Sequence, residues 1–134
     1  MRFLYLTLIY IISISQGFTL EHENSFQSYR TLMIFSPDVQ YISYREQLIL
    51  LSRDPIGLDQ RKISILEIFP IGGIEADGSI MDEDRVVNLR KEYKISDADF
   101  RIILLGETGD VKLNISETIT DQALFKLIDE EPEK

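Results

Sequence analysis

The sequence contains no cysteine and a single histidine, His22. Without cysteine the chain forms no disulfide and carries no thiolate, so thiol–disulfide exchange and cysteine-dependent peroxidase activity are excluded. One histidine near the N-terminus makes a poor basis for a histidine-containing catalytic triad, and the usual histidine and cysteine ligands of zinc are missing. We therefore expect no metal site and no cofactor.

Basic residues are also scarce. The chain has 14 lysines and arginines against 23 aspartates and glutamates, which gives a net charge of −9. Such a surface repels phosphate backbones and anionic membranes, so nucleic acid is disfavoured as a partner. The hydrophobic content of 44% nevertheless argues against disorder, and 134 residues suit a single domain.

No apolar run in the chain reaches the length that spans a bilayer. The N-terminal run from Phe3 to Ile14 has only two polar interruptions, but a transmembrane helix needs about 20 residues. Arg2 precedes this run, and the small residues Ser15 and Gly17 follow it. This layout predicts a signal peptide cleaved after Gly17, with a buried first strand or an uncleaved anchor as the alternative.

The predicted cleavage sets the expected organisation of the chain. We assign residues 1–17 to the signal peptide, 18–29 to a polar leading segment, 30–132 to one domain and 133–134 to an acidic tail. After cleavage no membrane span remains. The protein is then expected in the periplasm or outside the cell.

Continuous apolar runs predict the strands. The run at 31–35 is typical of a strand buried on both faces of a parallel sheet, and the isoleucine-rich segment 63–69 and the segment 100–105 predict two further strands. The glycine-bracketed turn at 106–110 leads into a further strand at 111–113, which must pair antiparallel with the strand before it. The glycines at 72, 73 and 78 predict a loop.

Helical spacing predicts three helices. The first covers 39–52, with Tyr41, Ile42, Leu48, Ile49 and Leu51 as its apolar positions and Asp38 as its cap. A second helix follows the acidic segment 82–84, and a third follows Thr120 as its cap. The segment 54–59, which contains proline and glycine, predicts a turn.

The resulting order is βαβαββα. Two parallel strands joined through a helix, then a helix, an antiparallel hairpin and a final helix make a thioredoxin-like α/β fold. The central sheet is mixed and helices cover both faces. Ferredoxin-like and doubly wound folds share parts of this order.

Three segments carry a family resemblance: Arg30 leading into 32–35, Arg61 leading into 63–69, and 100–112 completed by 124–132. They resemble the thioredoxin- and peroxiredoxin-like domain of unknown function found in coiled-coil domain-containing protein 80 and in sushi-repeat-containing proteins. The resemblance implies the fold more than a chemistry. Thr108 and Lys62 stand where the family pattern has acidic residues, which weakens any catalytic role at these two positions.

The head of the first predicted helix is the position at which thioredoxin-like enzymes carry their reactive cysteine. Here the segment contains Ser36, Asp38, Gln40 and Tyr41, and 97–99 lacks the proline that precedes the third strand in those enzymes. Ser36, Gln40 and Tyr41 are candidate ligand-binding residues. The alternative is structural, with Asp38 capping the helix and Tyr41 packing.

Glu67 is the unusual residue of the second strand. It shares a face with apolar residues at 63, 65 and 69, where an unpaired carboxylate is costly to bury. It is either an acid or base for catalysis or the partner of an arginine such as Arg85 or Arg53. The catalytic candidates are therefore Glu67, Asp38 and Arg61.

The missing thiol favours binding over catalysis. The sequence predicts an exported interaction module whose loops at 36–40, 71–78 and 97–100 contact another exported protein or an extracytoplasmic ligand. The alternative is a thiol-independent enzyme that uses Glu67 and Asp38.

Overall fold

A computed structural model describes residues 29–131 of the chain. The predicted signal peptide at 1–17, nearly all of the polar segment at 18–29, His22 and the acidic tail at 133–134 lie outside the described residues. Within the described part, no helix is long and apolar enough to cross a membrane.

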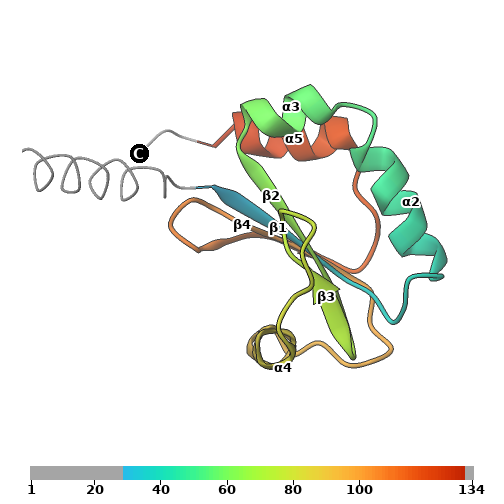
Figure 1. The fold of residues 1–134 in the computed structure, drawn as a ribbon. Helices are drawn as coiled ribbons and strands as arrows, with labels where there is room; N and C mark the ends of the chain where they lie inside the picture. Colours follow the sequence, from blue (N-terminus) through green and yellow to red (C-terminus); the bar gives the residue numbers. More distant parts are fainter. Residues whose placement is uncertain (1–28, 132–134) are drawn as a thin grey trace, which may run out of the picture.

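The described residues form a central sheet with helices packed against it (Figure 1). In chain order the elements are β1 (Arg30–Phe35), α2 (Ile42–Leu51), α3 (Pro55–Gln60), β2 (Ile63–Phe69), β3 (Gly72–Ile74), α4 (Glu83–Glu92), β4 (Arg101–Leu105), β5 (Val111–Ile115) and α5 (Asp121–Asp129). Every predicted strand and helix is present, and two short elements are added.

The sheet has the strand order β3-β2-β1-β4-β5. β1 pairs parallel with β2 and antiparallel with β4, while β3 and β5 pair antiparallel at the two edges. β1 therefore lies at the centre, and its buried apolar run follows from having strands on both sides and helices over both faces. The predicted mixed sheet is confirmed.

Helices cover both faces, as predicted. α2, α3 and α5 lie on one face and α4 lies on the other (Figure 1). Alternate residues of β1 supply the two cores: Leu32 and Ile34 face α2 and α5, whereas Met33 and Phe35 face α4. Burial of these side chains is the main source of stability in a chain without disulfides.

Two short elements were missed by the sequence analysis. The segment predicted as a turn at 54–59 is α3, because Asp54 accepts a hydrogen bond from the Gly57 amide at 2.8 Å and Pro55 occupies the first helical position. The glycines predicted as a loop include β3. A Cβ on Gly73 would lie 2.8 Å from the Glu67 carbonyl oxygen, so glycine permits this close strand pairing.

The predicted cap of the first helix was wrong, and of its predicted apolar positions Leu48 and Leu51 pack on the core. α2 begins at Ile42, and its N-cap is Tyr41; the Asp38 carboxylate instead accepts from the Gln40 amide at 2.8 Å. Ile42 and Ile49 are exposed. The buried face contains Tyr44, Gln47, Leu50 and Leu51.

Candidate functional site

The loop between β1 and α2 satisfies its own polar groups. The buried Ser36 hydroxyl donates to the Asp38 carbonyl oxygen at 2.8 Å, and Tyr41 stacks on Phe100 with ring centroids 5.9 Å apart. Gln40 and Tyr41 line a shallow surface depression beside Asp38. The loops at 36–40 and 97–100 therefore lie side by side, held by contacts between residues of this part of the chain.

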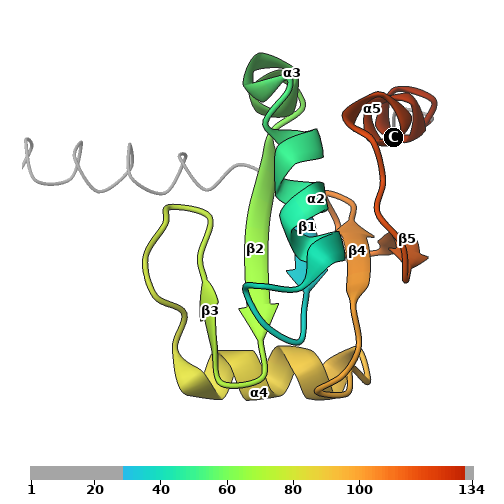
Figure 2. The ribbon, with the colours of Figure 1, turned by 90° about the vertical axis from the view of Figure 1, so that its right-hand side faces the viewer.

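An apolar groove lies beside β2. β2 runs between α2 and the segment that contains β3 (Figure 2), and the groove opens over it between these elements. Its volume is about 320 Å³, near the lower end of the range of ligand pockets. The walls are mainly apolar and come from four elements and the loop after β3: Leu48, Leu51, Pro55, Leu58, Ile65 and Ile74, with Glu67, Glu75 and Ala76.

Glu67 is one of two half-buried carboxylates that line this groove, the other being Glu75. Oε1 of Glu67 accepts a hydrogen bond of 2.5 Å from the hydroxyl of Tyr44 on α2. Burial, together with the hydrogen bond and the charge of Glu67, raises the pKa of Tyr44, so the phenol stays protonated and remains a donor. The ring of Tyr44 also packs edge-on against Phe69 at 5.2 Å, which fixes its position.

The predicted arginine partner of Glu67 was wrong. Arg85 pairs with Glu75 at 2.8 Å, and within residues 29–131 Arg53 forms no ion pair. Sequence analysis also missed Tyr44. The signal for it was available, because Tyr44, Leu48 and Leu51 follow helical spacing on the face that is buried.

Arg61 belongs to a different part of the molecule. Its guanidinium forms two hydrogen bonds to the Asp129 carboxylate, at 2.9 and 2.8 Å, donates to the Gly57 carbonyl oxygen and lies 4.1 Å from the centre of the Phe125 ring. The bond to Asp129 raises the pKa of Arg61 and lowers that of Asp129. Arg61 thus ties α3 and the start of β2 to α5.

The turn between β4 and β5 is a second polar junction. Lys112 Nζ lies 2.8 Å from Asp110 Oδ2 and 3.4 Å from Glu131 Oε1, and the Thr108 hydroxyl donates to Asp110 Oδ1. The hydrogen bonds from Lys112 and then Thr108 lower the pKa of Asp110 to about 2. Gly109 has a φ of 84°, a conformation that favours glycine.

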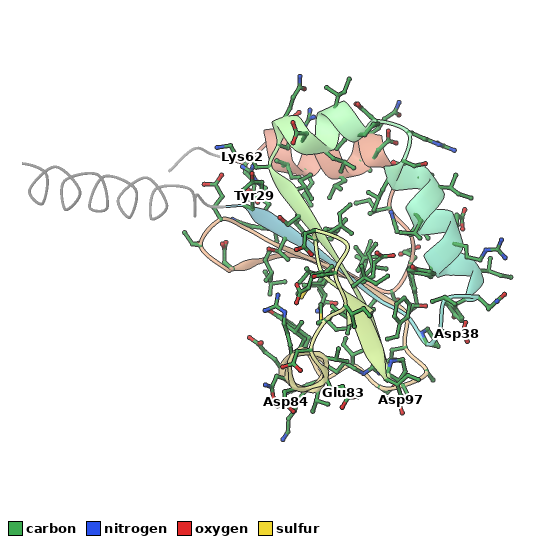
Figure 3. All side chains as sticks on the ribbon, in the orientation of Figure 1. Tyr29, Asp38, Lys62, Glu83, Asp84 and Asp97 are labelled. Carbon is green, nitrogen blue, oxygen red and sulfur yellow. The ribbon has the colours of Figure 1, made fainter. Side chains whose placement is uncertain are left out.

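The three catalytic candidates do not share a site. Glu67 lies in the groove, Asp38 follows β1, and Arg61 precedes the opposite end of β2. Lys62, the neighbour of Arg61, lies at the far end of the sheet from Asp38 (Figure 3). The four steps from Ile63 to Glu67 alone span roughly 13 Å of strand.

Comparison with known proteins matches residues 23–134 to the family described as "Domain of unknown function (DUF4174)". The chain belongs to this family. Arg61, Asp110, Lys112 and Asp129 of this DUF4174 chain lie in the two polar junctions described above, apart from the groove.

Relatives of this DUF4174 chain include the sushi repeat-containing proteins SRPX and SRPX2. Rat SRPX is 33% identical over 112 residues, which cover 80% of this chain and 24% of the relative. Human SRPX2 is 26% identical over 109 residues, which cover 78% of this chain and 23% of the relative. The chain therefore spans about a quarter of the length of these curated relatives.

The fold also resembles that of a solved enzyme structure. The reduced 2-Cys peroxiredoxin of Plasmodium vivax superimposes with a TM-score of 0.55 and 16% identity, over 75% of this chain and 76% of the other. At this identity the likeness concerns the fold alone. It confirms the predicted thioredoxin-like architecture of this DUF4174 domain, which has no cysteine.

Proposed function

We propose that this chain is an exported binding module that holds a partner protein against the groove beside β2. The observation that carries the proposal is the groove itself, an open apolar surface in a thioredoxin-like domain that has no thiol. Apolar walls with a few placed polar groups are characteristic of binding sites. The signal-peptide pattern at 1–17 supports a partner among exported proteins or extracytoplasmic ligands.

The groove also gives one of the predicted binding loops a role. Ile74, Glu75 and Ala76, from the loop predicted at 71–78, form one side of the groove. The loops at 36–40 and 97–100 meet at the Tyr41–Phe100 stack instead. We therefore assign the contact surface to the groove and place these two loops outside it.

The catalytic alternative has less support. A thiol-independent enzyme that combines Glu67, Asp38 and Arg61 needs these groups within reach of one substrate. They lie in three places, and the guanidinium of Arg61 is engaged by Asp129 and Gly57. Glu67 alone lies in the groove, where a binding role requires no further catalytic group.

The proposal is tested by blocking the groove. Ala76 is exposed at its rim, so Ala76→Trp fills the opening with little effect on the core. Lys91→Trp, on the exposed side of α4 across the sheet, is the matched control. The wild-type protein and the control should retain the same protein from the producing cell's exported fraction, and Ala76→Trp should lose it. Equal retention by all three proteins, or no retained protein, would contradict the proposal.

A further inference from the structure

The negative charge of Glu67 inside the groove indicates which kind of chemical group the groove binds. Glu67 projects from β2 on the face that packs against α2, where Ile63, Ile65 and Phe69 are its neighbours along the strand. Only Oε1 has a hydrogen-bond donor within residues 29–131, namely the Tyr44 hydroxyl. Oε2 accepts no hydrogen bond in this part of the chain, although a carboxylate can accept about four.

Glu67 also has no counter-ion in the described chain. No lysine or arginine within residues 29–131 forms an ion pair with it. Arg85, one of the partners expected from the sequence, pairs with Glu75 instead. A half-buried carboxylate without an ion-pair partner pays part of its desolvation cost, which the hydrogen bond from Tyr44 offsets only in part. A bound cation recovers that cost.

The walls of the groove match the rest of such a ligand. Leu48, Leu51, Ile65 and Ile74 surround the carboxylate with apolar surface. Lysine and arginine side chains combine a methylene stem, which packs on apolar surface, with a charged end. The net charge of −9 adds a long-range attraction for a basic partner.

We propose that the groove binds a lysine or arginine side chain flanked by apolar residues in a segment of the partner protein, with Glu67 as its counter-ion. The Tyr44 hydroxyl holds Oε1 and leaves Oε2 for the cation. Glu67 is then the residue that determines specificity. This inference rests on the proposed binding function and names the chemistry of its partner.

The test uses two blocked peptides, acetyl-Leu-Lys-Leu-amide and acetyl-Leu-Gln-Leu-amide, titrated into the ¹⁵N-labelled protein purified after expression of the full chain. The lysine peptide should shift the amide resonances of Leu51, Ile65 and Ile74 and bind about ten-fold more tightly than the glutamine peptide. A preference for neither peptide, or shifts confined to α4, would overturn the inference.

Glu67→Gln isolates the charge, because the glutamine carbonyl oxygen can still accept from Tyr44. It should abolish the preference for lysine, whereas Glu92→Gln, which removes the same charge from α4 across the sheet, should keep it. Equal preference in wild-type and Glu67→Gln proteins would contradict the role of Glu67. Should Glu67→Gln fail to fold, Ala76→Trp provides the second variant, and it should lose the lysine peptide.

The outcomes separate the two proposals. Failure of the lysine peptide to bind at about 10 mM refutes the basic side chain as ligand. The groove still stands as the binding surface if Ala76→Trp loses the captured protein while Lys91→Trp retains it. Loss of both results refutes the groove altogether.

Discussion

Arg61 shows how one residue can match a family pattern and a catalytic hypothesis while serving the fold. Its side chain is 23% exposed and connects α3, β2 and α5 through Asp129, Gly57 and Phe125. A planar guanidinium suits this geometry because it can form two parallel bonds to a carboxylate and stack on a ring. The residue type alone does not reveal which of these uses applies.

Replacement of Arg61 should therefore reduce stability. Arg61→Ala removes two charge-assisted hydrogen bonds and the contact with Phe125, and we expect a loss of about 2 kcal/mol in the free energy of unfolding. Urea denaturation measures it. Arg53→Ala, an exposed control without an ion pair in the described chain, should change stability by less than about 0.5 kcal/mol. Equal losses in the two variants would contradict the structural role.

Asp110 predicts a dependence of stability on pH. Its pKa in the folded chain is lowered to about 2, below the ordinary value near 3.8. A lowered folded pKa adds stability that is fully present above the ordinary value and disappears as pH falls from about 4 to about 2. Asp110→Asn should destabilise the protein at pH 6, and its urea midpoint should converge with that of wild type toward pH 2.5. A difference that is constant over this range would argue against the Asp110–Lys112 interaction.

Among the helices and strands, the sequence analysis was accurate where the residues of the segment itself determine its structure. β2 was predicted with its observed bounds because the segment is rich in isoleucine, a residue that favours strands. Thr120 caps α5 as predicted, with its hydroxyl accepting from the Ala123 amide at 3.1 Å. The face of α2 was only partly predicted because the buried Gln47 is polar. Its amide exchanges two hydrogen bonds with the Ile119 backbone, a distant contact that no local pattern encodes.

The candidate site was only partly predictable for the same reason. Glu67 could be identified from its apolar neighbours along one strand. Its partner Tyr44 lies 23 residues away, and the groove combines α2, α3, β2, β3 and the loop after β3. Short strands such as β3, whose glycines resemble a loop in sequence, become recognisable only once the neighbouring strand is in place.

Packing of α3 against α5 gives a test at this scale. A Cβ on Gly57 would lie 2.6 Å from Cε2 of Phe125 and 2.5 Å from Oδ2 of Asp54, so Gly57→Ala should displace α3 and cost about 1–3 kcal/mol. Gly72→Ala meets no atom within 4 Å and should change stability by less than about 0.5 kcal/mol. Thermal unfolding of the two variants compares them directly, and equal melting temperatures would refute the close packing at Gly57.

For the whole molecule, the predicted export signal can be tested independently of binding. Expression of the full chain in the cells that encode it should yield a product outside the cytoplasm whose N-terminus is Phe18, because the small residues Ser15 and Gly17 flank the expected cleavage site. N-terminal sequencing gives the answer. A product that begins at Met1 and stays in the cytoplasm would contradict the predicted export.

The absence of cysteine and the groove beside β2 together shape the functional account. A thioredoxin-like domain without thiols retains the rigid sheet and its helices, and the exposed groove offers the surface on which a partner can be held. The loop at the head of α2 is held by internal contacts, the Ser36–Asp38 hydrogen bond and the Tyr41–Phe100 stack. The proposed binding surface therefore lies beside β2, whereas thiol-dependent members of this fold use the end of β1.

The most direct test of this claim is site-specific photo-cross-linking in the producing cells. A photoreactive amino acid is placed at Ala76, on the rim of the groove, or at Lys91 on α4, and each exported protein is irradiated in place. The account predicts a discrete cross-linked partner from position 76 and none from position 91. No adduct at position 76, or the same adduct from both positions, would contradict it.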